Sequence, residues 1–234
     1  MSDSVKARVC HMELFYGTAL RKLTQNMRYL MKICVVVLAF AVPLPAVAEN
    51  ATIIAPVFAQ LVTGPLPDGF VPAFENADAT GYINEALPKG ETLETWTQLI
   101  TLTGAKGLAV GDAPTSALEF AEFLADKYKA ACPDAHVAEQ FETPAIKGAR
   151  ESFMGYLSCG AVNGGAQSES MVFLVMVGAQ DIYTVQWAEH DVASPTGIAY
   201  GAEKWGPRLD QMITATRLCE ILPGEPAPYP SCVQ

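Results

Sequence analysis

The chain has 234 residues, of which 50% are hydrophobic and 17% charged, and its formal net charge is −10. This composition is typical of a folded globular protein and excludes an intrinsically disordered chain. The acidic balance disfavours binding to nucleic acid or to anionic lipid surfaces, because both present negatively charged phosphate groups.

The N-terminal residues have the pattern of an exported precursor. Arg28 and Lys32 precede an apolar run at 33–42, and a small-x-small sequence that ends at Ala48 follows. A basic start, a short apolar core and such a site predict a signal peptide at 27–48 that is cleaved after Ala48. The apolar run is about half the roughly 20 residues that a membrane span needs, so no stable membrane anchor is expected after cleavage.

Cleavage leaves residues 49–234, which we expect to fold as a single domain in the periplasm or outside the cell. Residues 1–26 are interpreted as an N-terminal extension that results from a mis-assigned start codon. The exported part holds nine Lys and Arg against 23 Asp and Glu, so its formal net charge is −14.

The exported part contains four cysteines: Cys132, Cys159, Cys219 and Cys232. An even number in an exported chain predicts two structural disulfides, for which three connectivities are open. We favour Cys219–Cys232, which closes a proline-rich tail, together with Cys132–Cys159, which joins the end of a helix to a strand. No pair has C-x-x-C spacing, so neither a thioredoxin-like redox centre nor a zinc knuckle is indicated.

The predicted elements begin with an apolar segment at 49–69, which is either an extended arm or a first edge strand. Strands are predicted at 70–78 and 80–88, separated by residues typical of a turn. A third strand, at 96–103, is indicated by its alternating pattern and its β-branched residues. A glycine-rich loop covers 104–111.

The clearest helix is predicted at 115–131, where apolar residues recur at helical spacing and lysines lie near the end. A strand at 136–141 and a meander of three strands at 151–160, 168–178 and 182–190 follow. The middle strand of the meander contains MVFLVMV, so we expect it inside the sheet with both faces covered.

A second helix is predicted at 203–218, with Gly206 and Pro207 in its first turn. The order is therefore three strands, a helix, four strands and a helix. It predicts an α+β fold in which an antiparallel β-sheet is packed by two main helices. The tryptophans Trp96, Trp187 and Trp205 are expected in the core.

Sequence motifs for catalysis are absent from the chain. It has no Gly-x-Ser-x-Gly nucleophile elbow, P-loop, dinucleotide fingerprint or His-Glu-x-x-His, and Ser158 lacks the elbow spacing. A speculative metal site would combine His190 and Asp191 with His136, because imidazole and carboxylate groups bind metals. Neighbours on a strand point to opposite faces, however, so a polar strand end in solvent is the favoured interpretation. No other cofactor is expected.

Several segments resemble a family of exported proteobacterial proteins. They are PKGETLETWTQLIT at 88–101, a tryptophan-containing helix, a terminal cysteine pair and a G-x-x-D-x-Y-x-V-Q segment made by Gly178, Asp181, Tyr183, Val185 and Gln186. The order of strands and helices over 66–232 is similar to that of the Mog1/PsbP-like α/β/α sandwich. PsbP-like proteins are accessory factors of larger assemblies, so the resemblance implies a non-catalytic role, and it assigns no site residue.

These observations predict a non-catalytic periplasmic binding or accessory protein. Its partner would be an unidentified protein or small molecule, and not nucleic acid. One alternative is a metal-dependent or other hydrolase that uses His190 and neighbouring carboxylates. The other is an envelope or secretion-associated protein whose ligand is another protein.

Overall fold

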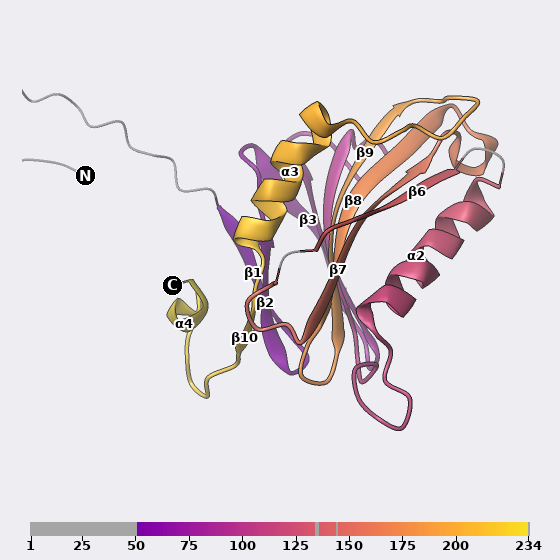
Figure 1. The fold of residues 1–234 in the computed structure, drawn as a ribbon. Coiled ribbons are helices and arrows are strands. Elements are labelled where there is room, and N and C mark those ends of the chain that lie inside the picture. The colour runs from indigo at the N-terminus through magenta and orange to yellow at the C-terminus, as the bar shows by residue number, and fades with distance from the viewer. Residues whose placement is uncertain (1–50, 134–135, 144, 234) are drawn as a thin grey trace, which may run out of the picture. The chain divides into compact units, whose positions relative to one another are not determined.

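The computed structural model describes residues 51–133, 136–143 and 145–233 (Figure 1). The predicted signal peptide at 27–48 and the extension at 1–26 lie outside these residues. In the described part of the chain, no helix is long and apolar enough to cross a membrane.

A seven-stranded antiparallel sheet forms the centre of the fold, with the strand order β3-β4-β5-β9-β8-β7-β6. The strands are β3 (Phe70–Ala77), β4 (Gly81–Pro88), β5 (Gln98–Ala105), β6 (His136–Phe141), β7 (Glu151–Cys159), β8 (Gln167–Val177) and β9 (Ile182–Val192). All seven strands predicted between residues 70 and 190 are therefore present in one sheet. The predicted α+β class, an antiparallel sheet packed by two main helices, is confirmed.

Strand β8 lies inside the sheet, between β7 and β9, as predicted. Every residue from Met171 to Val177 is buried. Side chains of β8 alternate between two apolar clusters: Val172, Leu174 and Met176 belong to one cluster, and the residues between them to the other. A strand that is apolar on both faces has to be packed on both faces, and different elements of the structure pack on each face.

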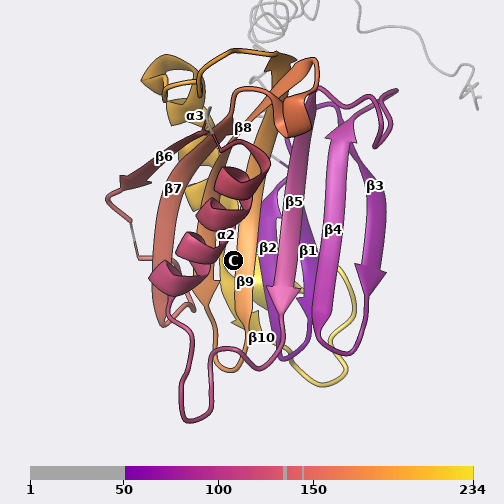
Figure 2. The same cartoon turned by 90° about the vertical axis from the view of Figure 1, so that its right-hand side faces the viewer.

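Helix α2 (Ala117–Ala131) covers one face of the sheet. Ser116 and Glu119 form a reciprocal capping box at its start, which satisfies backbone N–H groups that the first turn leaves unpaired. The helix packs mainly on β7 and β8, and Figure 2 shows that it leaves β3, β4 and β5 uncovered on this face. Ala117 and Ala121 are buried, so small side chains let the helix approach the sheet closely.

The other face is covered by a small second sheet with the strand order β1-β2-β10. Its strands are β1 (Thr52–Val57), β2 (Gln60–Pro65) and β10 (Leu218–Glu220). The segment 49–69, predicted as one arm or one edge strand, is thus a hairpin. Ala55, Val57 and Val62 face the main sheet and are buried in its larger cluster, so the hairpin gains stability from tertiary packing that local pattern does not encode.

Helix α3 (Ala202–Ala215) packs beside the small sheet through Trp205, Leu209 and Met212. It begins at Ala202, so Pro207 lies in the second turn and not in the first. The helix was predicted to continue to residue 218, but Thr63 of β2 ends it earlier. The Thr63 hydroxyl donates to the Ala215 carbonyl at 2.5 Å and accepts from the Arg217 N–H at 2.9 Å, and the chain then pairs with β2 as β10.

Candidate functional site

The register of the main sheet separates the three residues of the speculative metal site. His190 on β9 lies opposite Glu169 on β8, Glu169 lies opposite Cys159 on β7, and Cys159 lies opposite His136 on β6. His136 and His190 thus share a face but are three strand spacings apart, about 14 Å. Asp191, the next residue along β9, points to the opposite face, so the three side chains do not converge.

Both ring nitrogens of His190 are occupied within the protein. Nδ1 lies 3.2 Å from the carbonyl oxygen of Trp96, and Nε2 lies 3.1 Å from Oε2 of Glu169. The imidazole also stacks on the half-buried Trp96 ring, with the ring centroids 3.5 Å apart. A histidine metal ligand needs a ring nitrogen free to bind the metal, and this arrangement leaves none.

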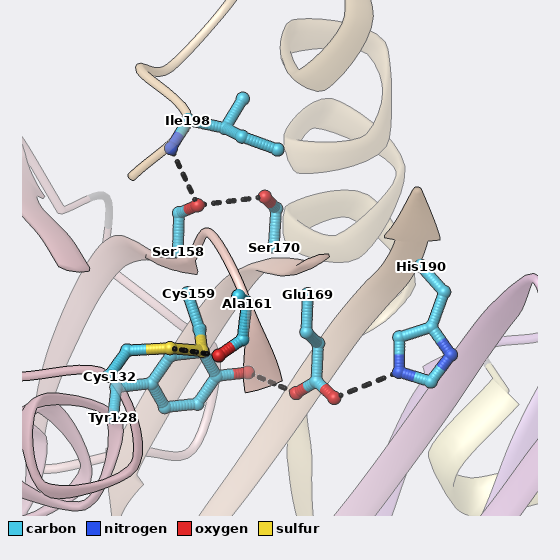
Figure 3. The surroundings of a disulfide bond; sticks show 9 residues. All are labelled: Tyr128, Cys132, Ser158, Cys159, Ala161, Glu169, Ser170, His190 and Ile198. Atoms are coloured by element: carbon cyan, nitrogen blue, oxygen red, sulfur yellow. Dashed lines mark hydrogen bonds and ion pairs between the residues drawn. A yellow bond between two sulfur atoms is a disulfide. The ribbon is translucent and has the colours of Figure 1, made fainter. Parts of the chain in front are cut away.

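Glu169 joins His190 to helix α2. Its Oε1 accepts a hydrogen bond from the Tyr128 hydroxyl at 2.5 Å, while its Oε2 faces His190 (Figure 3). Burial first, and the negative charge of Glu169 second, raise the pKa of Tyr128 well above its ordinary value near 10. The phenol therefore stays neutral and keeps donating to the carboxylate. We call Tyr128, Glu169, His190 and Trp96 the Glu169 network.

The Glu169 network adjoins the disulfide between Cys132 and Cys159, which ties the C-terminal end of α2 to β7 (Figure 3). A small hollow of about 180 Å³ lies between this disulfide, Tyr128 and Glu169. The structure thus pairs Cys132 with Cys159 and Cys219 with Cys232, which is the favoured pairing. Two disulfides in one domain are typical of proteins that mature in an oxidising compartment outside the cytoplasm.

The chemistry available around the Glu169 network is limited. Ser158 is fully buried, and its hydroxyl accepts from the Ser170 hydroxyl and from the Ile198 N–H, so it is not placed as a nucleophile (Figure 3). Within the described ranges, no group of three or more His, Cys, Asp or Glu could hold a metal ion. Glu189, the acidic neighbour of His190, instead forms ion pairs with Lys204 and Arg208 of α3. The network therefore fastens α2 and the loop before β5 to the sheet.

The residues of the G-x-x-D-x-Y-x-V-Q segment have structural roles. The buried Asp181 carboxylate accepts from the Gly107 N–H at 2.7 Å, the Ala59 N–H at 3.3 Å and the Tyr183 hydroxyl at 3.1 Å. A Cβ at Gly178 would lie 2.2 Å from Oε1 of Gln60, so only glycine fits there. These residues hold together the β1–β2 turn, the glycine-rich loop and the β8–β9 turn.

A groove of about 840 Å³ lies on the other side of the main sheet, between α3, the small sheet and the C-terminal tail. Its floor is formed by Thr52 and Ile54 of β1 and by Thr63 of β2. The volume is in the range of sites that bind drug-sized molecules, roughly 300 to 1,000 Å³. None of the described residues that line the groove is aromatic.

Helix α3 forms the polar wall of the groove. Pro207, Asp210, Gln211 and Thr214 line it, at the spacing that places residues on one face of a helix. The side chains of Asp210, Gln211 and Thr214 make no hydrogen bond or ion pair with any residue that the structure describes. This row of donors and acceptors is therefore available to a ligand.

The C-terminal tail forms the second wall through Pro228, Cys232 and Val233. The wall is largely apolar, and the Val233 side chain is 54% exposed. Helix α4 (Pro230–Val233) carries this wall, and Figure 1 shows it beside the small sheet, across from the end of α3. The Cys219–Cys232 disulfide joins the tail to β10 and so fixes the wall in place.

The sequence pattern gave no binding role to the residues that line the groove: Pro207 was placed in the second helix and Cys232 in a disulfide. The signals present were the apolar lead-in at 49–69, the proline-rich tail and the polar stripe of the second helix. Each signal is local, whereas the groove forms only where β1, α3 and the tail meet, which are up to 180 residues apart in the chain. The cysteine pair at 219 and 232 was the one feature that pointed to a fixed tail.

No protein-family model matches the chain, and no curated protein matches its sequence. Among solved structures, the chain is similar to the Ran-binding protein Mog1p of Saccharomyces cerevisiae, with 10% identity over 74% of this chain and 97% of that chain and a TM-score of 0.42. PsbP (CyanoP) from Synechocystis sp. PCC 6803 aligns with 9% identity over 75% of this chain and 96% of its own, with a TM-score of 0.42. LpqN, involved in cell envelope biogenesis of Mycobacterium tuberculosis, aligns with 9% identity over 73% of this chain and 91% of its own, with a TM-score of 0.37.

The structural resemblance to Mog1/PsbP-like proteins that the element order indicated is thus found among solved structures. It concerns the fold alone. What the domain binds has to be argued from its own residues.

Proposed function

We propose that residues 49–234 form a non-catalytic binding protein of the periplasm, which holds its ligand or partner in the groove between α3, the small sheet and the tail. One observation carries the proposal. The groove is preformed, because a disulfide fixes one wall and a packed helix forms the other, and preformed concave sites bind without the cost of ordering loops.

The contrast with the Glu169 network supports a binding role over a hydrolytic one. The Tyr128 hydroxyl, both Glu169 oxygens and both ring nitrogens of His190 have partners inside the protein, so none of these groups is placed to activate water or a nucleophile. The polar row on α3, by comparison, lines the groove and makes no hydrogen bond or ion pair with the described residues. Available polar groups in a preformed hollow are what a binding site needs.

The test uses the protein purified from the periplasm and a neutral fluorescent probe, N-phenyl-1-naphthylamine. Thr214→Trp fills the groove from the α3 wall, and Glu203→Trp places the same side chain on an exposed part of α3 outside it. We expect the probe to bind the wild type and Glu203→Trp, and to lose at least tenfold in affinity with Thr214→Trp. Equal binding by the two variants would contradict the proposal.

Native mass spectrometry of the same preparation measures the intact mass, which reports cleavage after Ala48 and both disulfides. A molecule that stays bound to the wild type and is absent from Thr214→Trp would identify the natural ligand. A molecule retained equally by both variants would place the binding site elsewhere.

A further inference from the structure

We infer that the groove binds an extended polypeptide segment that carries basic side chains. The inference rests on the function proposed above and names the class of its ligand. Four properties of the groove lead to it: the absence of aromatic residues, the spacing of the polar wall, the open side at β1 and the charge.

The lining residues disfavour the other common classes of ligand. Nucleobases and sugars are usually held by stacking on aromatic rings, and the part of the groove lining that the structure describes has none. Anions need available cationic groups. Arg217 is the one basic residue among the described lining residues, and it already interacts within the protein. A purely apolar chain would gain nothing from the polar row on α3.

The polar wall matches the repeat of an extended chain. Asp210 and Thr214 are four residues apart on α3, which places them about 6 Å apart along the helix axis. Two residues of an extended polypeptide span about 6.6 Å, so its N–H and C=O groups recur at nearly this spacing. Gln211 and Thr214 each offer both a donor and an acceptor to such a backbone. Alternate side chains of the segment would then face Ile54 and the apolar tail wall.

The groove can admit part of a longer chain. Strand β1 is the outer strand of the small sheet, and no described strand lies beyond it. The floor at Thr52 and Ile54 is therefore not closed by a further strand on that side. A segment in the middle of a partner protein could enter and leave across this edge, which an enclosed pocket would not allow.

The negative charge of the groove and of the domain favours a segment with basic side chains. Among the described residues of the lining, Asp210 is the single carboxylate, and it is exposed. It belongs to a domain with a formal net charge of −14. A Lys or Arg that pairs with Asp210 would be attracted over a longer range by the acidic surface, which raises the rate of association.

The experiment offers the periplasmic protein a library of acetylated, amidated hexapeptides and measures binding by native mass spectrometry. Half of the peptides carry Lys at alternate positions and half carry Glu, with Val, Thr or Leu between them. We expect the Lys set to bind and the Glu set not to bind. Asp210→Asn should weaken binding of the Lys set about fivefold, as for one exposed ion pair.

Two variants separate groove binding from general attraction to an acidic protein. Glu203→Gln makes the same charge change on the same helix outside the groove, and it should leave binding unchanged. Thr214→Trp should abolish binding of the Lys set. Equal loss in Asp210→Asn and Glu203→Gln, or binding that survives Thr214→Trp, would overturn the inference.

The outcome also distinguishes this inference from the proposed function. If the naphthylamine probe binds in the groove and no peptide does, the domain is a binding protein for another class of ligand and the peptide inference is wrong. If neither binds, both are wrong.

Discussion

The α2 side and the α3 side of the main sheet are built from the same parts: a helix, a sheet face and one disulfide. On the α2 side, Glu169 receives the Tyr128 hydroxyl and faces His190, so the polar groups are used inside the protein. On the α3 side, Asp210, Gln211 and Thr214 face a groove and make no hydrogen bond or ion pair with the described residues.

This difference separates structure from function within one domain. A buried polar group without a partner destabilises a fold, so a network that satisfies all its members contributes to stability. A polar group that faces a groove contributes little to stability and keeps its bonding capacity for a ligand. His190, which the sequence offered as a candidate metal ligand, therefore stabilises the fold. The polar residues that line the groove belong to no sequence motif.

Removal of each disulfide should give the largest effects and should separate the two sides. On the loop-entropy model, loss of Cys132–Cys159, with a sequence separation of 27, costs about 3.6 kcal/mol. Loss of Cys219–Cys232, with a separation of 13, costs about 2.9 kcal/mol. We expect urea denaturation of the Cys→Ser pairs to show both losses, while only the second pair reduces ligand binding. Equal effects on binding would break the comparison.

Tyr128→Phe should cost about 2 kcal/mol, because it removes a hydrogen bond to a charged group and leaves Glu169 with one partner fewer. Chemical denaturation measures the loss. Tyr229→Phe is the matched control, since the Tyr229 hydroxyl bonds to no described residue. Binding in the groove should be unchanged in both variants. A change of the same size in the control would show that the Glu169 network does not stabilise the fold.

Alkaline pH should weaken the fold through the same tyrosine. Because the folded pKa of Tyr128 is raised, the unfolded chain loses this proton first, and the free energy of unfolding falls as pH rises above about 10. One such group lowers it by about 1.4 kcal/mol for each pH unit until its folded pKa is reached. Tyr128→Phe should have a shallower slope by this amount. Identical slopes would show that burial does not raise this pKa.

Substitutions in the polar row of the groove should have the smallest effect on stability. Asp210→Ala, Gln211→Ala and Thr214→Ala should each change the free energy of unfolding by less than about 0.5 kcal/mol, since their side chains bond to no described residue. Thermal denaturation checks the stabilities, and the same variants serve in the binding assays. A loss above about 1 kcal/mol would assign these residues a structural role.

Much of the fold could be predicted from sequence because its elements have strong local signals. Alternation in 96–103 and the doubly apolar MVFLVMV strand predicted strands, and helical spacing with Glu119 near the start predicted α2. The prediction of a single arm or strand at 49–69 was wrong. The prolines of this segment gave no sign of a hairpin, which packing on the main sheet stabilises. The predicted end of α3 at residue 218 was wrong, because the hydroxyl of Thr63, about 150 residues earlier, forms hydrogen bonds with the backbone of Ala215 and Arg217.

By itself, the sequence determined the α+β class and the number of strands in the main sheet, and it favoured one of the three open pairings of the four cysteines. These follow from periodicity, β-propensity and loop length, which are properties of neighbouring residues. Only the tertiary structure decided that His190 faces Glu169 across a strand pair and that β1, α3 and the tail enclose a groove. Those contacts depend on the register of the sheet and on the packing of elements that are distant in the chain. Neither can be predicted from the pattern of neighbouring residues.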